Sequence, residues 1–324
     1  MLKIGDVTIP NRVFAAPMAG VTDKAFRILA RENDCGLVFT EMINDMGLIY
    51  RQVRTEKMAD ITGEKPPVAI QIFGFEPEKL GQAAQIAESM GADIIDVNMG
   101  CPAPKIIRNG AGAALMNDIK GCRAIIRAVS QAVKIPITIK MRSGWDEENL
   151  NYMELGGVAE EEGARAVTLH ARSRIQFYAG KADWTQIARL KKALSIPVIG
   201  NGDITCPDDA VKMFNETGCD AVMLGRAALG DPHLFRRTVR LIETGERIPP
   251  ATVAQRMEMA ERQLSLAIAF KGEYTAVREM RKHLSWYVKG ISGAAQIRVE
   301  INRAANQQEM LAIIARIKNG FKLD

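Results

Sequence analysis

Eight short apolar segments recur along the first 230 residues, and the stretches between them are long enough to hold a helix. Several segments are apolar at consecutive positions, which is typical of strands with both faces buried. This alternation predicts parallel strands joined by helical crossovers. Eight units within about 240 residues favour an α/β fold, the TIM (β/α)8 barrel. The predicted strands are Val13–Pro17, Leu37–Met42, Pro67–Phe73, Ile94–Met99, Pro136–Met141, Ala166–His170, Pro197–Gly200 and Ala221–Leu224.

An open, doubly wound sheet is the alternative α/β arrangement. Such a sheet typically carries a G-x-G-x-x-G phosphate loop directly after its first strand. Here the first predicted strand runs into Pro17-Met18-Ala19-Gly20, and the similar Gly110-Ala-Gly112 follows a loop. The spacing of the glycines therefore disfavours the open sheet.

The end of the chain has a different character. Pro249-Pro250 closes the region of alternating strands, and Thr252 is placed to cap a following helix. Helical segments are predicted near 252–270, 273–289 and 294–318. We therefore expect a barrel domain over residues 1–245 and an all-helical domain over residues 246–324.

The basic residues are unevenly distributed between these two regions. The whole chain has a net charge of +5, and residues 251–324 hold 12 Lys/Arg and 7 Asp/Glu. The excess of positive charge therefore lies entirely in the helical region. A solvated helical face and a partner with a phosphate backbone both explain this bias.

Composition narrows the class of protein. The chain is 47% hydrophobic and 25% charged, as expected of a soluble globular protein. No apolar run approaches the roughly 18 residues of a membrane span, and the N-terminus lacks the apolar stretch of a signal peptide. Five cysteines without C-x-x-C spacing indicate reduced thiols, and argue against disulfides and structural zinc. We therefore expect a cytoplasmic, monomeric protein with no membrane contact and no metal.

Polar residues gather where the predicted strands end, which is the face that carries active sites in TIM barrels. Two of the following loops, Gly200-Asn-Gly-Asp and Gly225-Arg-Ala-Ala-Leu-Gly, are rich in glycine, so that backbone N–H groups can approach an anion closely. This pattern favours a phosphorylated cofactor. The polar residues at the strand ends are Gln71, Asn98, Cys101, Lys140, Arg142, His170, Arg172, Asn201, Asp203 and Arg226.

Cys101 lies in Asn98-Met-Gly-Cys-Pro, directly after a predicted strand. A thiol of ordinary pKa is mostly protonated near neutral pH and can donate a proton. As a thiolate it could instead act as a nucleophile, with His170 as the base if the fold brings the two together. We expect Cys35, Cys122 and Cys219, by contrast, to be core filler.

The segment from Ile95 to Ala113, Ile-Asp-Val-Asn-Met-Gly-Cys-Pro-Ala-Pro-Lys-Ile-Ile-Arg-Asn-Gly-Ala-Gly-Ala, resembles the signature of bacterial tRNA-dihydrouridine synthases. Ala15-Ala-Pro-Met-Ala-Gly-Val-Thr-Asp23 resembles their opening motif. Lys140-Met-Arg-Ser-Gly-Trp145, His170-Ala-Arg-Ser-Arg174, Asn201-Gly-Asp-Ile204 and Gly225-Arg-Ala-Ala228 continue the likeness in the same order. The resemblance covers essentially the whole chain and is strongest to the B-type branch.

This resemblance implies an enzyme that binds FMN in its barrel domain, uses NADPH as reductant and holds tRNA with its helical domain. Cys101 is the implied catalytic residue. The implied cofactor-binding residues are Pro17, Met18, Ala19, Gln71, Lys140, His170, Asn201, Gly202, Asp203, Gly225 and Arg226. The candidate substrate contacts are Asn98, Arg142 and Arg172 in the barrel and Arg278, Arg281 and Lys282 in the helical domain.

The implied reaction is reduction of specific tRNA uridines to 5,6-dihydrouridine, with hydride passing from reduced FMN to C6 and a proton from Cys101 to C5. Three rival functions remain open: a flavoenzyme acting on a free pyrimidine, such as a dihydroorotate dehydrogenase; an RNA-binding barrel without catalysis; and a phosphate-binding isomerase. The sequence leaves undecided which uridine is reduced and whether NADPH or NADH is preferred.

Overall fold

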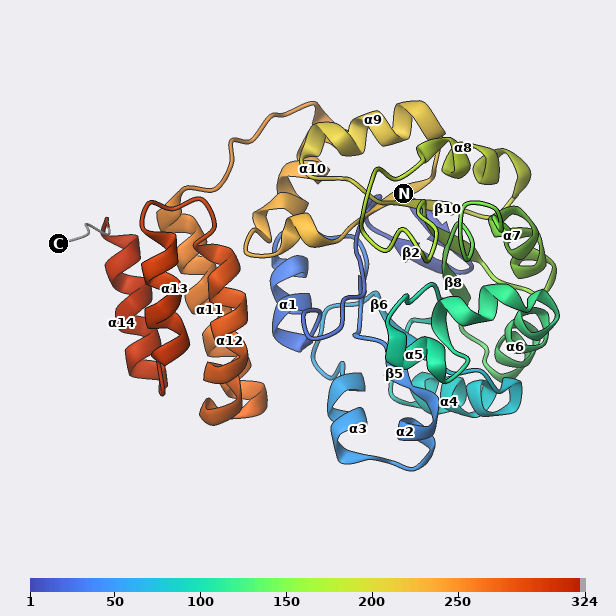
Figure 1. Cartoon of the computed structure of the whole chain (residues 1–324), viewed down its shortest axis with the longest axis horizontal. Helices are drawn as coiled ribbons and strands as arrows, with labels where there is room; N and C mark the ends of the chain where they lie inside the picture. Colours follow the sequence, from blue (N-terminus) through green and yellow to red (C-terminus); the bar gives the residue numbers. More distant parts are fainter. Residues whose placement is uncertain (321–324) are drawn as a thin grey trace.

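The computed structural model describes residues 1–320 and shows a closed barrel of eight parallel strands (Figure 1). Neighbouring strands pair in the order β3-β11-β10-β9-β8-β7-β6-β4. A parallel bridge between Phe14 and Leu37 joins the two ends of this series. The predicted TIM barrel is therefore confirmed. Its strands are β3 (Val13–Ala15), β4 (Val38–Phe39), β6 (Val68–Phe73), β7 (Ile94–Met99), β8 (Ile137–Arg142), β9 (Ala166–His170), β10 (Val198–Asn201) and β11 (Ala221–Leu224).

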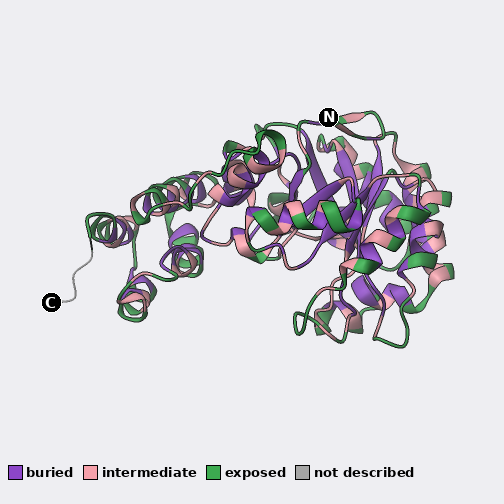
Figure 2. Ribbon diagram, turned by 90° about the horizontal axis from the view of Figure 1, so that it is seen from above, coloured by how far each residue is buried: buried purple, intermediate pink, exposed green. Residues whose placement is uncertain are grey.

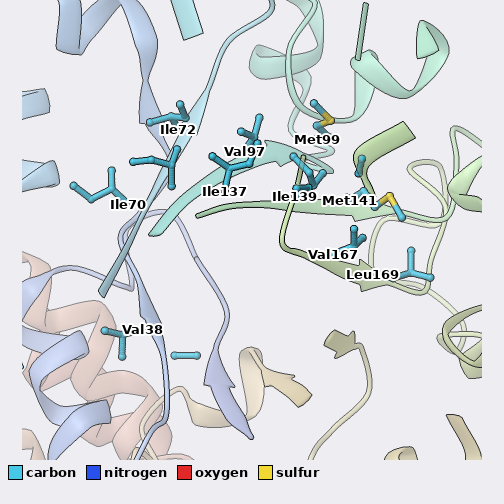
Figure 3. Packing of buried hydrophobic residues seen from close by; sticks show 14 of the residues in the cluster. Val38, Ile70, Ile72, Val97, Met99, Ile137, Ile139, Met141, Val167 and Leu169 are labelled. Carbon is cyan, nitrogen blue, oxygen red and sulfur yellow. The ribbon is translucent and has the colours of Figure 1, made fainter. Parts of the chain in front are cut away.

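Side chains alternate between the barrel interior and the surrounding helices. Figure 3 shows one such set, in which Ile70, Val97 and Ile139 of successive strands pack together with their neighbours in one buried cluster. Because side chains alternate along a strand, residues such as Asp96 and Lys140 point into the barrel. The strands thus place one apolar set against the helices, while the inward-facing set has polar residues such as Asp96 and Lys140 toward the strand ends.

The helices that cover the barrel follow the strands in turn. The longer ones are α1 (Lys24–Glu32), α4 (Pro77–Ser89), α6 (Ile119–Ala132), α7 (Tyr152–Glu161), α8 (Trp184–Ala193), α9 (Pro207–Thr217) and α10 (His233–Thr244). Short elements extend the loops: β5 (Ile43–Asn44), α2 (Asp45–Ile49), α3 (Val53–Ala59), α5 (Pro104–Arg108), η1 (Gly112–Asn117) and η2 (Arg226–Ala228). The strands at the centre are almost wholly buried (Figure 2). Cys35, Cys122 and Cys219 are buried as predicted.

A hairpin that the sequence analysis did not predict precedes the barrel. It consists of β1 (Leu2–Ile4) and β2 (Val7–Ile9), joined by Gly5-Asp6. Ile4 and Ile9 are buried against residues at the starts of the barrel strands, including Phe14. The hairpin therefore plugs the end of the barrel opposite the polar strand ends. Gly-Asp between two short alternating runs is itself a hairpin signal.

Four helices form the C-terminal region: α11 (Val253–Lys271), α12 (Glu273–Tyr287), α13 (Ala294–Arg303) and α14 (Gln307–Lys318). Thr252 caps α11 as predicted, and its Oγ1 accepts a hydrogen bond from the backbone N–H of Gln255 at 3.2 Å. The prediction of one helical segment over 294–318 is wrong. The segment is broken at Ala304–Asn306, where the Asn306 side chain starts α14 by accepting from the Glu309 amide. Among the described residues, no helix is both long and apolar enough to cross a membrane.

The helical region packs against the barrel through α11, which contacts α1, and through α12, which contacts the loop after β11. Ala25 and Leu29 of α1 form a small apolar cluster with Leu266 of α11 and its neighbours. Lys271 Nζ lies 2.5 Å from Asp23 Oδ2 at the edge of this contact. Gly230, after β11, lies so close to α12 that a Cβ there would come within 2.5 Å of the Trp286 carbonyl carbon. The end of α12 is therefore held against the face of the barrel where the strands end.

Candidate active site

The C-terminal ends of the barrel strands enclose a cavity of about 760 Å³. This volume lies within the range of about 300–1,000 Å³ that is usual for ligand and cofactor sites. Most of the residues predicted to bind the cofactor line it, although they come from five separate stretches of the chain. They are Pro17, Met18, Lys140, His170, Asn201, Gly202, Asp203, Gly225 and Arg226.

Lys140 provides a cation on the barrel axis. Its Nζ donates to Asn201 Oδ1 at 3.0 Å, and Asn201 Nδ2 in turn donates to the Met223 carbonyl at 2.8 Å. Burial, together with the neighbouring Arg142, lowers the pKa of Lys140 to about 8. Lys140 is therefore still mostly protonated at neutral pH, and its position is fixed by an asparagine on another strand.

His170 also faces the cavity, with Arg172 Nη1 3.4 Å from its Nε2. Burial and the surrounding cations Lys140, Arg142 and Arg172 hold the pKa of His170 well below its usual value. The imidazole is consequently neutral near pH 7, where it can donate and accept hydrogen bonds without carrying a charge.

Gln71 and Ala19 do not line the cavity. Ala19 is exposed on the rim, whereas Gln71 is buried inside the barrel. Gln71 Nε2 donates to Asp96 Oδ2 at 2.6 Å, and its Oε1 accepts from Asn98 Nδ2 at 2.9 Å. Both ends of the Gln71 amide thus already have partners within the protein.

Asp96 lies at the centre of this buried network, and the sequence analysis did not single it out. Its Oδ1 accepts from Thr138 Oγ1 at 2.6 Å. Burial raises the pKa of Asp96 to about 6 against the hydrogen bonds from Thr138 and Gln71, which lower it. Its place in the inward-facing series of β7, two residues before Asn98, was the signal that could have revealed it.

Cys101 is half-buried at the end of β7. Asn98 Oδ1 accepts from the backbone N–H of Cys101 at 2.9 Å and from that of Gly100 at 3.2 Å. Burial raises the pKa of the Cys101 thiol, although Arg142 and Lys140 act in the other direction. The side chain is therefore a neutral thiol at physiological pH, the form that a proton donor requires.

Arg142 and Arg172 are each only 2% exposed, and both hold the loop that follows β9. Arg142 Nη1 donates to the carbonyls of Ser173 and Phe177, each at 2.8 Å. Arg172 Nη2 donates to the Gly180 carbonyl at 2.9 Å and lies 2.6 Å from Asp203 Oδ1. The structure thus gives both arginines a role in shaping the rim, and their contact with substrate stays a prediction.

Tyr178, in the same loop, is a further lining residue that the sequence analysis missed. Its ring lies under the Arg226 guanidinium at 4.6 Å and near that of Arg142 at 5.5 Å. The His170 ring is 6.4 Å away. The exposed aromatic pair Phe177-Tyr178, in the loop that follows β9, was the available signal.

The three cations predicted on the helical domain have different surroundings. Arg278 is exposed and stacks over the Tyr274 ring at 3.4 Å. Arg281 is half-buried and donates to the Ala304 carbonyl, where α13 ends, at 2.7 Å. Lys282 reaches across to the barrel and donates to the Gly20 carbonyl at 2.6 Å. As predicted, the opposite face of α12, with Val277, Met280, Leu284 and Val288, is buried.

The helical domain also supplies part of the cavity wall, which the sequence analysis did not foresee. Arg256, Trp286 and Lys289 line the cavity together with the loop that follows β11. Gly230 and Asp231 of that loop lie on the barrel side. The cavity therefore extends from the barrel axis to the seam between the barrel and the C-terminal helices.

The sequence is similar to one family of known proteins over nearly its whole length. Residues 14–321 match the family model described as "Dihydrouridine synthase (Dus)". The chain is 39% identical to tRNA-dihydrouridine synthase B of Pseudomonas aeruginosa, over 97% of this chain and 95% of that protein. It is 41% identical to the protein of the same name from Xanthomonas axonopodis pv. citri, over 96% and 94%. A probable tRNA-dihydrouridine synthase of Rickettsia bellii is 38% identical, over 93% of each.

Two solved structures share the fold at low sequence identity. A histamine dehydrogenase from Rhizobium sp. 4-9 has a TM-score of 0.59 at 15% identity, covering 82% of this chain and 50% of that one. A 2-naphthoyl-CoA reductase has a TM-score of 0.59 at 16% identity, covering 75% and 51%. This chain therefore spans about half the length of each of these proteins. The family model and the relatives match nearly the whole sequence. They show that the chain belongs to the dihydrouridine synthase family, in its bacterial B-type branch.

Proposed function

We propose that the protein reduces specific uridines in tRNA to 5,6-dihydrouridine, with FMN as cofactor and NADPH as reductant. The observation that carries the proposal is a cavity with a fixed cation on its axis, Lys140, and the neutral thiol of Cys101 at the neighbouring strand end. The relatives named as tRNA-dihydrouridine synthases, similar over nearly the whole chain, support the choice of substrate.

The residues present fit FMN. Lys140, Asn201 and His170 line the cavity with a cation and uncharged polar groups. Gly202, Gly225 and Arg226 provide flexible backbone and a guanidinium, in the loops after the seventh and eighth strands. These loops are the usual phosphate-binding position in TIM barrels. When bound, reduced FMN supplies the hydride that is added to C6 of uracil.

Cys101 completes the reaction by donating its proton to C5 of the uracil ring. The thiol is kept protonated because burial raises its pKa. Asn98 holds the Cys101 backbone, and the Asp96–Gln71 pair holds Asn98. We propose that Arg142 and Arg172 support the base and its flanking phosphates through the rim that they shape.

A uridine in folded RNA must leave its stack to reach the end of a barrel, so backbone contacts must supply the binding energy. We propose that residues 1–245 carry catalysis and that residues 246–324 hold tRNA. Arg278 and Lys282 lie on the exposed face of α12, and Lys282 lies at the barrel rim. Arg281 contributes by fixing the end of α13. The five free cysteines are consistent with a cytoplasmic enzyme.

The test uses purified full-length protein with FMN, NADPH and cellular tRNA that lacks dihydrouridine. We expect NADPH to bleach the flavin absorbance, tRNA to restore it, and mass spectrometry to show two added hydrogens on particular uridines. NADH in place of NADPH tests the choice of reductant. Reduction of free pyrimidines but not of tRNA would instead identify a small-pyrimidine enzyme. Failure to bind FMN would contradict the proposal.

A further inference from the structure

The seam between the barrel and the helical domain carries three cations for which no carboxylate partner is found among residues 1–320. Arg226 comes from the barrel, and Arg256 and Lys289 come from the helical domain. All three line the cavity. Two acids also line the cavity: Asp203 binds Arg172 at 2.6 Å, and Asp231 Oδ2 lies 3.3 Å from Arg237 Nη1.

The seam also concentrates buried polar atoms that lack a hydrogen-bond partner. Within residues 1–320 five such side-chain atoms occur, and three of them belong to Asp231, His233 and Arg256. The Nε of Arg256 is among them, while its Nη1 donates to the Lys289 carbonyl at 2.9 Å. Of these three atoms, Arg256 Nε is a donor and Asp231 Oδ1 is an acceptor. A buried donor without a partner costs roughly 1–3 kcal/mol, so an acceptor group of a ligand at Arg256 Nε would be stabilising.

We infer that Arg256 and Lys289 bind the phosphate end of the flavin cofactor together with Arg226, so that the helical domain is part of the cofactor site. This inference rests on the proposed use of FMN. A phosphate monoester carries a charge of about −1.5 to −2 at neutral pH, which one guanidinium does not neutralise. The cavity is continuous from Lys140 on the barrel axis past the glycine loops to these cations. A ligand with its ring at Lys140 and its phosphate beyond Gly225 therefore extends to the seam.

The arrangement makes cofactor retention depend on the docking of the two domains. Arg226 is fixed by stacking on Tyr178 at 4.6 Å. Lys289 follows the end of α12, which is held against Gly230 of the barrel. The phosphate lies between these two walls. Flavin binding consequently stabilises the docked arrangement, and loss of docking releases the flavin.

The experiment compares FMN with riboflavin, which has the same ring but no phosphate. Apoprotein is titrated with each flavin, and binding is followed by quenching of flavin fluorescence. Lys289→Gln is the cleaner change, because the Arg256 hydrogen bond goes to the Lys289 backbone and not to its side chain. Arg256→Ala is the second variant. Arg303→Gln removes one exposed positive charge from the same domain, away from the cavity, and serves as control.

We expect Lys289→Gln and Arg256→Ala to weaken FMN binding roughly 10- to 100-fold, as for loss of a hydrogen bond to a charged group. Riboflavin binding stays unchanged in both, and the control changes neither. An equal loss for the two flavins, or no loss, would overturn the inference. Weaker tRNA binding with unchanged FMN affinity would also overturn it, and would assign the seam to RNA phosphates. If wild-type apoprotein binds neither flavin, the proposed function itself fails.

Discussion

The side-chain oxygen of Asn98 accepts a hydrogen bond from the backbone N–H of Cys101 at 2.9 Å, so the turn that presents the thiol is fixed by a residue three positions earlier. Asn98 is itself bound to Gln71, and Gln71 to Asp96. The position of Cys101, the proposed proton donor, is thus determined by a chain of hydrogen bonds that begins deep inside the barrel.

Replacing the thiol of Cys101 tests its role as proton donor. We expect Cys101→Ala to slow formation of dihydrouridine by roughly 10²–10⁴-fold, the usual contribution of a positioned acid. FMN binding should be unaffected, because Cys101 does not line the cavity that we assign to FMN. Single-turnover mass spectrometry of tRNA measures the rate. Cys206→Ser, which changes a cysteine elsewhere, serves as control, and a native rate in Cys101→Ala would refute the role.

Asp96 is expected to position Gln71 and Asn98 through its charge. Both of its oxygens accept hydrogen bonds, and an asparagine would present one N–H group to a donor. Asp96→Asn should therefore lower the free energy of unfolding by about 1–3 kcal/mol and also slow turnover. Thr138→Val removes one of the two donors and leaves the Gln71 contact in place. It should reduce stability with little effect on turnover, and equal turnover losses in the two variants would contradict the positioning role.

Gly230 tests how closely the helical domain must approach the barrel. Gly230→Ala places a Cβ within 2.5 Å of the α12 backbone, whereas Gly245→Ala meets nothing within 4 Å. The two glycines have nearly the same φ, +72° and +73°, so they share the cost of a left-handed residue, about 1–2 kcal/mol. We expect Gly230→Ala to lower the free energy of unfolding by at least about 1 kcal/mol more than Gly245→Ala does, and therefore to lower the melting temperature more. Equal melting temperatures would show that the seam can widen freely.

Because of buried His283, we expect the free energy of unfolding to fall in acid. It is buried beside Gln263, and burial lowers its pKa to about 4 from an ordinary value near 6.5. Between these two values the unfolded chain binds a proton that the folded protein does not, so stability falls as the pH drops from about 6.5 to 4. The loss reaches about 3 kcal/mol for this one group. Urea unfolding across this pH range should show a shallower slope in His283→Gln than in the wild type.

Local patterns were sufficient to predict the architecture. The nearly continuous apolar run Val68–Phe73 marked a buried parallel strand, because burial of both faces favours such runs. Thr252 was recognisable as a cap because its hydrogen bond is to a residue three positions away. The break at Asn306 and the hairpin at Gly5-Asp6 carried comparable local signals that were not used.

The sequence by itself determined the barrel, the family and the residues at the strand ends, since period, spacing and motif are properties of neighbouring positions. Only the tertiary structure showed that Gln71 is bound to Asp96 inside the barrel, and that Arg256 and Lys289 line the same cavity as Arg226. These relationships join residues that are tens of positions apart. They depend on barrel closure and on how α12 docks at Gly230, and no local pattern encodes the distance between two packed domains.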